Sequence, residues 1–397
     1  MQIKMKQKTI HILLTILMLA TGLKGEAQTV NHLDSMEISL LTCSPGKEIW
    51  AQYGHTALRI RNLANGQDLT VNYGIFSSSQ PYFALRFLFG LTDYHVGVSY
   101  TELFLSEYAR EGRGITEQKL NLSSTDKQAI YKALQHNLKP ENVIYRYNFF
   151  YDNCTSRARD LITNNLHGKL SFPKDNKRVS FRSMIHQWNF VNKWSQLGED
   201  LLLGVKADCP TTQSEQQFLP ANLMNDLSNT IYRGKSIVSE TNQLLEPHST
   251  LENDSSIFNP ILVGVLFAIL STIIIIMEYK KRRIFWFWDA SLLLLSGLIG
   301  IILFLMIFSQ HPCVSLNINI LFFNPLCLVF FYPVIKNARR GKSHRWWSIW
   351  QISIILGFIG TLFQRVPIPI LIVASFLLIN CMIHRFIFTK QRPKIHE

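Results

Sequence analysis

The last third of the chain consists largely of apolar segments, which constrain the fold more than any other feature of the sequence. Each segment is long enough to cross the ~30 Å hydrocarbon core of a bilayer as an α-helix, and a helix satisfies its own backbone hydrogen bonds in lipid. The sequence therefore predicts an all-α transmembrane region of about five helices over residues 257–386. The apolar segments lie at about 258–277, 288–308, 317–335, 346–363 and 366–384.

The basic residues around these segments indicate their orientation. Thirteen Lys and Arg lie at 280–283, 336–345 and 385–394, whereas the loops on the opposite side hold only Arg365. Because Lys and Arg are enriched on the cytoplasmic side of membrane proteins, we expect a multi-pass protein of the inner (cytoplasmic) membrane. Residues 387–397 would form a basic cytoplasmic tail, and the region before residue 257 would lie on the periplasmic side.

The N-terminus has the pattern of a secretory signal peptide. Three lysines within the first eight residues precede an apolar run at 10–23, and the small residues Gly25 and Ala27 follow it. A basic start, a short apolar run and small residues at a cleavage site are typical of such peptides. We therefore expect residues 1–27 to be removed as a signal peptide, with an uncleaved anchor helix as the alternative.

The net charge of +13 could suggest a nucleic-acid partner, but the distribution of the charge argues against one. Residues 28–256 carry 22 Lys and Arg against 23 Asp and Glu, so this region is nearly neutral. The excess lies in the predicted signal peptide and in the loops between apolar segments, where it reflects membrane topology. We therefore expect no nucleic-acid partner.

Residues 28–250 show the mixed pattern of an exported α+β domain. Short β-rich segments predict strands, and Asn65-Gly66 is typical of a hairpin turn. Residues 170–256 give little pattern, and 244–256 resemble a linker. The strands are predicted at 38–42, 55–60, 68–73 and 143–149, and helices at 127–138 and from Cys154 onward.

Cys154 and His55 are the strongest candidates for a catalytic pair. Cys154 follows Asp152-Asn153, and either residue can cap a helix. A helix N-terminus or a nearby protonated histidine lowers the pKa of a thiol toward the reactive thiolate. His55 opens a predicted strand, so the two residues have the settings of a papain-type site, in the permuted order with histidine first. The sequence thus predicts Cys154 as nucleophile and His55 as base.

A third polar group usually orients the imidazole in such a site. Asn72 on the following hairpin strand is our candidate, with Gln52 and Tyr53 as rivals. Backbone N–H groups at the start of the Cys154 helix could stabilise an oxyanion.

A disulfide is the alternative role for a cysteine in an exported domain. Cys43 and Cys209 also precede the membrane region, and three cysteines cannot all pair among themselves. If Cys43 pairs with Cys209, Cys154 is the unpaired thiol.

Polar residues gather at the start of the third apolar segment. His311, Asn317, Asn319 and Asn324 lie within 311–325, where polar side chains in a membrane are costly unless they are paired or functional. One interpretation is a site for a lipid head group or substrate. The alternative is a structural polar contact between helices.

Three motifs resemble the Lnb-type lipoprotein N-acyltransferase family. They are Tyr-Gly-His-Thr-Ala-Leu-Arg-Ile at 53–60, Tyr-Asp-Asn-Cys-Thr-Ser-Arg at 151–157 and His-Pro…Asn-x-Asn-x-Leu…Asn-Pro at 311–325. The order of histidine and cysteine also resembles the permuted papain-like thiol acyltransferases of the lecithin:retinol acyltransferase group. The resemblance implies an α+β, permuted papain-like (NlpC-like) exported domain followed by the membrane helices.

The resemblance also implies an activity. Cys154 would take an acyl chain from a membrane phospholipid, and the α-amino group of the diacylglyceryl-cysteine of a lipoprotein would accept it. Tyr53, Asn153 and Arg157, which flank the pair, are further candidates for contact with substrate or lipid, and the aromatic stretch 76–108 could shield the acyl chain. No cofactor is expected.

Two other functions stay open at this point. A papain-like amidase or endopeptidase would use the same Cys and His on peptidoglycan peptides, but it needs no multi-helix membrane region. A non-enzymatic envelope scaffold would have an unreactive and dispensable Cys154.

Overall fold

The chain forms two compact units, which are described separately. The predicted division near residue 250 differs from the one observed, because residues 179–210 pack with the helices of the second unit. The predicted signal peptide lies outside the described residues. The computed structural model describes residues 35–77, 79, 81–173, 178–248 and 257–390, of which 35–178 and 211–248 belong to an α+β unit and 179–210 and 257–390 to a helical unit.

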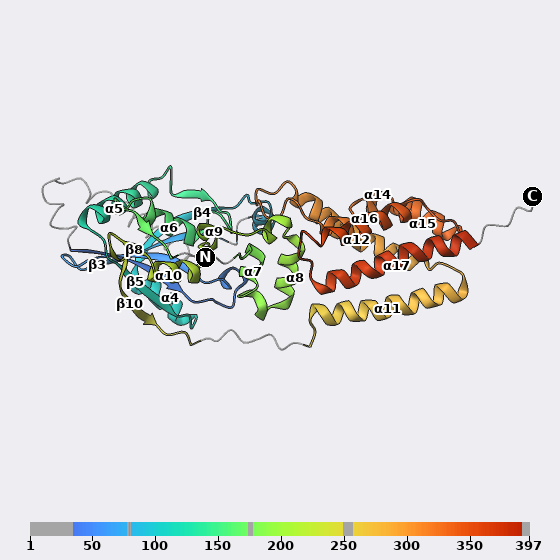
Figure 1. The fold of residues 1–397 in the computed structure, drawn as a ribbon, viewed down its shortest axis with the longest axis horizontal. Coiled ribbons are helices and arrows are strands. Elements are labelled where there is room, and N and C mark those ends of the chain that lie inside the picture. Colours follow the sequence, from blue (N-terminus) through green and yellow to red (C-terminus); the bar gives the residue numbers. More distant parts are fainter. Residues whose placement is uncertain (1–34, 78, 80, 174–177, 249–256, 391–397) are drawn as a thin grey trace, which may run out of the picture. The chain divides into compact units, whose positions relative to one another are not determined.

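An antiparallel sheet forms the centre of the α+β unit (Figure 1). The strands predicted at 38–42, 55–60 and 68–73 are confirmed as β1, β2 and β3. Gly66 has φ +73°, which favours glycine, in the turn that joins β2 to β3. The seven strands described run in the order β10-β5-β1-β2-β3-β4-β6, and their bounds are β1 Met36–Cys43, β2 His55–Asn62, β3 Gln67–Ile75, β4 Asp93–Tyr100, β5 Ile115–Leu120, β6 Ile144–Arg146 and β10 Val238–Leu245.

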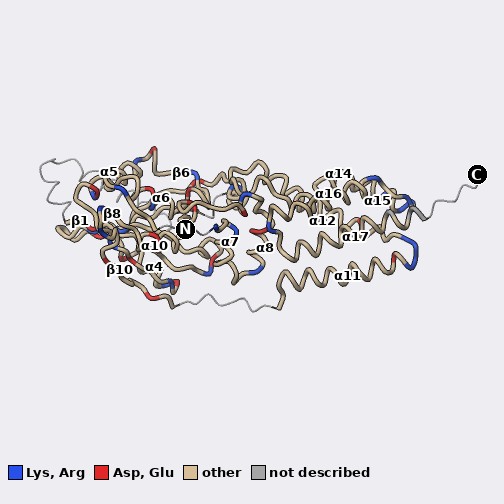
Figure 2. The backbone as a smooth tube through the Cα atoms, viewed as in Figure 1, with Lys and Arg blue, Asp and Glu red and all other residues tan. Residues whose placement is uncertain are grey.

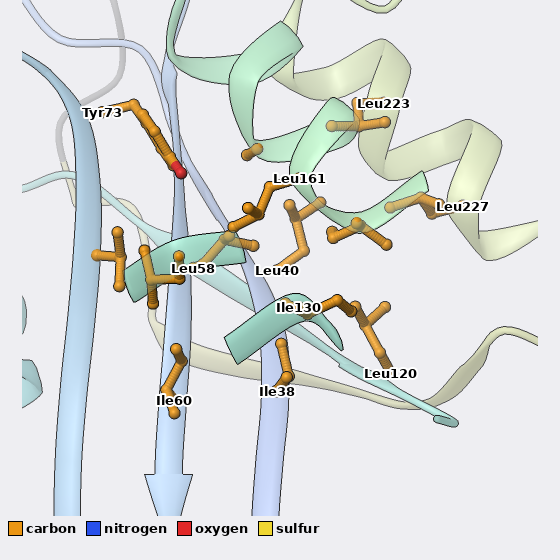
Figure 3. Packing of buried hydrophobic residues seen from close by; sticks show 14 of the residues in the cluster. Ile38, Leu40, Leu58, Ile60, Tyr73, Leu120, Ile130, Leu161, Leu223 and Leu227 are labelled. Carbon is orange, nitrogen blue, oxygen red and sulfur yellow. The ribbon is translucent and has the colours of Figure 1, made fainter. Parts of the chain in front are cut away.

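Three helices pack on one face of this sheet and build its main core. The predicted helix at 127–138 is α5, which starts earlier because Ser123 and Asp126 form a capping box. Side chains of a strand alternate between the two faces, so Leu40 and Leu58 point together toward Leu161 of α6 (Figure 3). The three helices are α5 Ser124–Asn137, α6 Cys154–Thr163 and α10 Pro220–Ser228.

A smaller core is formed by the side chains of β1 and β2 that point away from the main core. Phe104 and Tyr108 of α4 (Thr101–Arg110) pack there with Leu41 and Cys43. The remaining elements of the α+β unit are short: η1 Ile49–Ala51, α3 Phe83–Leu88, α9 Gln213–Gln216, and a small sheet of β7 Leu170–Ser171, β8 Ile231–Tyr232 and β9 Lys235–Ser236.

The helical unit contains the predicted apolar helices. Among the described residues, α11 (Pro260–Lys281) and α12 (Trp286–Met306) are long and apolar enough to cross a membrane. Two further apolar helices are shorter, namely α16 (Trp346–Gly360) and the apolar part of α17 (Ile368–Lys390). The region is therefore helical and apolar, and five complete spans stay a prediction.

The third predicted segment is broken, which corrects the expectation of a continuous helix at 317–335. The helices on either side of Phe330 are bent by 73°. Proline lacks an N–H and disfavours helix at the residue before it. Asn324-Pro325 therefore interrupts the helix that precedes Phe330. A β-carbon on Gly300 of α12 would lie 2.5 Å from the Pro325 nitrogen, so the glycine lets the interrupted backbone pack closely. The pieces are α13 Asn319–Phe322, α14 Leu326–Val329 and α15 Phe331–Arg339.

The basic residues of the helical unit gather where α11, α15 and α17 end (Figure 2). Lys280 and Lys281 lie in the last turn of α11, and Lys336 and Arg339 in that of α15. Cations there also complement the partial negative charge of a helix C-terminus. This clustering is the structural form of the charge asymmetry seen in the sequence.

Residues 179–210 add four short helices to the helical unit. Arg182 lies fully buried among them and forms ion pairs with Asp200 at 2.6 Å and Asp208 at 2.9 Å. A buried guanidinium needs such partners because an unpaired buried charge is strongly destabilising. These helices are α7 Phe181–Ile185, η2 Asn189–Val191, α8 Lys193–Leu202 and η3 Val205–Asp208.

Candidate active site

Cys154 is the first residue of α6, and Asn153 fixes the conformation of this helix start. The Asn153 Oδ1 accepts hydrogen bonds from the N–H groups of Thr155 and Ser156, each at 2.9 Å. Its Nδ2 donates to the carbonyl groups of Phe149 and Phe218. These bonds use both ends of a side chain that is almost fully buried, so they support a structural role for Asn153 rather than the predicted contact with substrate.

His55 is the first residue of β2, and its imidazole faces Asn72 of β3. Ala57 pairs with Asn72 across the two strands, and His55 lies two residues before Ala57, so both side chains are on one face. The His55 Nε2 lies 2.6 Å from the Asn72 Oδ1. Because an amide oxygen only accepts, Nε2 carries the proton and Nδ1 is left for the thiol.

Cys154 and His55 are in hydrogen-bond contact and shift each other's pKa. Burial alone raises the pKa of Cys154, but the charge of His55 and hydrogen bonds from His55, the Thr56 N–H and Thr155 lower it from 9.0 to about 7. Burial lowers the pKa of His55, but the thiolate charge and the hydrogen bonds to Cys154 and Asn72 outweigh this and raise it. The pair therefore favours a thiolate next to an imidazolium, which is the form that attacks carbonyl carbons.

The two rivals of Asn72 directly precede Gly54 and His55 in the sequence. Gln52 is buried, and its Oε1 has no hydrogen-bond partner among the described residues. The Tyr53 ring packs edge-on against Phe149, with 5.1 Å between ring centroids.

Arg157 lies one turn beyond Cys154 and is held in place by two contacts. Its Nε and Nη2 donate to the two carboxylate oxygens of Asp152 at 2.6 and 2.8 Å. Its guanidinium carbon lies 3.5 Å from the centroid of the Tyr145 ring. The predicted lipid-binding Arg157 is thus oriented by the protein, with part of its side chain exposed.

A row of aromatic rings extends from the neighbourhood of Cys154 to the surface. The Tyr94 ring stacks on Tyr147 at 4.1 Å and on Phe76 at 4.9 Å. Phe76 in turn contacts Phe83 and the 61% exposed Trp50. The predicted aromatic stretch 76–108 is therefore divided, since its later members Phe104 and Tyr108 belong to the smaller core around Cys43.

All six cysteines lie in the described part of the chain, and all are free thiols. Cys43 is buried and Cys209 is exposed, and no disulfide joins them. Among the described residues, no group of three or more His, Cys, Asp or Glu side chains is placed to hold a metal ion.

Comparison with protein families decides what kind of chain this is. Residues 26–187 match the Lnb N-terminal periplasmic domain, and residues 252–392 match the Lnb transmembrane domain. The chain belongs to the Lnb family. No curated protein and no solved structure matched it.

The Lnb-family matches include every predicted site residue. His55, Asn72 and Cys154 lie in the part that matches the periplasmic domain, and the polar residues of 311–325 lie in the part that matches the transmembrane domain. Residues 188–251 lie outside both matches, although α8 and α10 pack within the two units.

The polar residues of 311–325 contact the end of α8. The Asn317 Nδ2 donates to the carbonyl groups of Leu201 at 2.7 Å and Leu202 at 3.0 Å, and the Asn319 Nδ2 donates to that of Leu201 at 3.1 Å. The last four carbonyl groups of a helix lack partners within the helix. These bonds therefore favour the structural alternative for both asparagines.

The other two residues of this group have different surroundings. His311 is buried, and Asn324 contacts Ser353 of α16 at 3.5 Å while its Oδ1 accepts from the Leu326 N–H. The structure brings Gln364, which the sequence did not single out, to Asn317 at 3.0 Å. A role of His311 or Asn324 in lipid binding stays a prediction.

The sequence reasoning also passed over a buried polar cluster in the helical unit. His384 lies 2.9 Å from Asp289, Asn380 donates to Asp289 at 3.2 Å, and the Trp347 ring stacks on His384. Asp289 and His384 both lie within predicted apolar segments, and ionisable residues there are rare and paired. This signal was available from the sequence, as was the spacing of four residues that puts Asn380 and His384 on one helix face.

Proposed function

We propose that this Lnb-family protein is a lipoprotein N-acyltransferase that works through a thioester on Cys154. The observation that carries the proposal is the contact of Cys154 with His55, whose other nitrogen is bonded to Asn72. A thiolate held by an imidazolium suits acyl transfer, and a chain with a transmembrane domain has lipid-borne acyl groups at hand. The phospholipid would be the donor and a diacylated lipoprotein the acceptor.

In the first step the thiolate sulfur of Cys154 attacks an ester carbonyl carbon of the phospholipid. The carbonyl electron pair moves to oxygen and then returns as the bond to the glyceryl oxygen breaks. The imidazolium of His55 gives its proton to that oxygen, so a lysophospholipid leaves and neutral His55 faces an S-acyl Cys154.

In the second step the α-amino group of the diacylglyceryl-cysteine attacks the thioester. Neutral His55 takes the proton that the amine loses as the new C–N bond forms, and the thiolate leaves. The products are a triacylated lipoprotein and the original ion pair. Asn72 keeps Nδ1 of His55 directed at the reacting atoms by accepting a hydrogen bond from the Nε2–H group, so its role is positioning.

The proposed placement follows the family and the charges. The domain of residues 28–250 would lie on the periplasmic side of the inner membrane, anchored by several helices of residues 257–386, with 387–397 as a cytoplasmic tail. The basic ends of α11 and α15 support this orientation.

The test is the intact mass of a model lipoprotein in cells that lack their own N-acyltransferase. The full chain would be expressed as wild type, as Cys154→Ala and as Cys209→Ala, a control that removes an exposed thiol elsewhere. We expect a gain of one acyl mass with the wild type and with Cys209→Ala, and none with Cys154→Ala, because the nucleophile is gone.

Other outcomes would overturn the proposal. A gain with Cys154→Ala would exclude the thioester route. An unchanged mass with a relocated acyl chain would exclude a phospholipid donor and indicate transfer within the lipoprotein. Unmodified lipoprotein in all three strains, together with cleaved peptidoglycan peptides, would favour the amidase.

A further inference from the structure

The acyl-transfer site needs hydrogen-bond donors for the oxyanion that forms when the carbonyl group is attacked. The start of α6 supplies fewer donors than its sequence suggests. The N–H groups of Thr155 and Ser156 both donate to the Asn153 side chain, and that of Arg157 donates to the Asn153 carbonyl. The N–H of Cys154 is the one left in this turn without a partner among the described residues.

Tyr145 carries a second unused donor close to this point. Tyr145 lies in β6, is only 7% exposed, and its hydroxyl has no hydrogen-bond partner among the described residues. Buried hydroxyl groups are nearly always hydrogen-bonded, and an unsatisfied one is a cost that calls for an explanation. Burial, and secondly the charge of Cys154, raise the pKa of Tyr145, so the hydroxyl keeps its proton and can donate.

Gly74 lies next to both the hydroxyl and the nucleophile. A β-carbon on Gly74 would lie 3.6 Å from the Cys154 Cβ and 3.9 Å from the Tyr145 Oη. Gly74 has no such atom, and its φ of +91° is one that favours glycine. The Tyr145 hydroxyl and the Cys154 side chain are therefore both neighbours of Gly74 on β3.

Arg157 makes the Tyr145 hydroxyl a stronger hydrogen-bond donor. Its guanidinium lies 3.5 Å from the centroid of the Tyr145 ring, and Asp152 holds it there through two hydrogen bonds. A cation over a ring is attracted to its π-electrons and draws on them. The phenol hydrogen becomes more positive, which makes it a stronger donor toward a negative oxygen.

We propose that the Tyr145 hydroxyl and the Cys154 N–H form the oxyanion hole of this site, with Arg157 as a positioning residue. The inference rests on the proposed acyl transfer and adds a residue to it. When the sulfur bonds to the carbonyl carbon, the carbonyl electron pair moves to oxygen, which accepts hydrogen bonds from both groups. The pair returns as the leaving group departs, and Tyr145 keeps its proton throughout.

Two reactions of Cys154 separate this role from other roles of Tyr145. Acylation by a p-nitrophenyl ester passes through an oxyanion and releases a coloured product, whereas alkylation by iodoacetamide forms no oxyanion. Both would be measured on the purified full chain in detergent micelles, with Cys154 alkylation followed by peptide mass. The variant is Tyr145→Phe, which removes only the hydroxyl.

The matched control is Tyr73→Phe. Tyr73 is also fully buried, but its hydroxyl already accepts a hydrogen bond from Asn137 at 2.9 Å. Loss of one oxyanion donor lowers rates by about 10²-fold or more, so we expect Tyr145→Phe to lower acylation by that factor. The rate of Cys154 alkylation in Tyr145→Phe should stay within about twofold of the wild-type rate because the thiolate is unchanged. In Tyr73→Phe the rates of both reactions should stay within the same limit.

Two results would overturn the inference. Acylation of Tyr145→Phe at the wild-type rate would show that the hydroxyl does not bind the oxyanion. An equal fall in acylation and alkylation would place the effect on the thiolate instead. Neither reaction uses phospholipid or lipoprotein. A failure of N-acylation in cells would therefore contradict the proposed function without testing the role of Tyr145.

Discussion

The α+β unit holds two thiols near His55 in contrasting surroundings, one buried and one half-buried. Cys43 of β1 lies directly opposite His55 in the strand ladder, packed among Leu41, Phe104 and Tyr108. Cys154 lies at the start of α6 and contacts His55 itself. Burial raises the pKa of Cys43 to about 12, whereas the pKa of Cys154 is lowered to about 7.

The difference shows that nearness to the histidine in the backbone does not make a thiol reactive. Burial disfavours the thiolate in both places, but only Cys154 has the imidazolium and a backbone N–H to compensate. For Cys43, Arg113 and Tyr108 lower the pKa by less than burial raises it. The thiolate form is therefore disfavoured at Cys43 and favoured at Cys154.

The variant His55→Gln should reduce the difference between the two thiols most. The change removes both the proton carrier and the charge that stabilises the thiolate, so acyl transfer should fall by about 10³-fold. The pKa of Cys154 should return to 9.0 or above, which lowers its alkylation rate at pH 7 by about 50-fold or more. The check is the alkylation rate of Cys154 from pH 5 to 10.

The wild type gives the reference curve for this variant. Thiolate forms as pH rises, so alkylation of the wild type should increase through a midpoint at about 7. A midpoint that is the same in His55→Gln would contradict the ion pair.

A smaller effect is expected from Asn72→Ala. The imidazole keeps its place in the strand but loses the acceptor that fixes its ring, and misplaced catalytic groups cost about 10²-fold. Loss of the hydrogen bond from Nε2 should also lower the pKa of His55, so the midpoint of Cys154 alkylation should move upward. A merely structural asparagine would lower the melting temperature without moving this midpoint.

The smallest effect should come from Cys43→Ala, which tests whether the other thiol is dispensable. Cys43 is 1% exposed and touches no reacting atom, so the variant should transfer acyl chains within about twofold of the wild type despite some lost packing. In the wild type, peptide mass spectrometry after alkylation at pH 8 should find label on Cys154 and none on Cys43. Equal labelling of both thiols would contradict the contrast.

Much of this site could be predicted because it depends on short-range patterns. Asn153 caps its own helix through the N–H groups two and three residues later, so the position of Cys154 follows from local sequence. His55 and Asn72 belong to one hairpin, where the turn and the alternation of side chains fix which residues share a face. The membrane region could be predicted because length and apolar character alone select a spanning helix.

Other features depended on which segments meet in space. Tyr145 reaches the site because β6 pairs with β4 at the edge of the sheet, and nothing in the local sequence of β6 specifies that neighbour. A carbonyl group at the end of α8 accepts a hydrogen bond from Asn317, which is more than a hundred residues away in the chain. Long-range pairing of this kind is set by the sum of many packing and hydrogen-bond contacts.

The sequence by itself determined the two kinds of domain, the helix start at Cys154 and the hairpin that joins His55 to Asn72. Each depends on residues that are close in the chain, where backbone geometry leaves few arrangements. Only the tertiary structure decided that Cys43 is buried with a raised pKa, that the Tyr145 hydroxyl lies beside Gly74 and that the third apolar segment is broken. The physical reason is that burial, and the partners that compensate for it, come from distant segments.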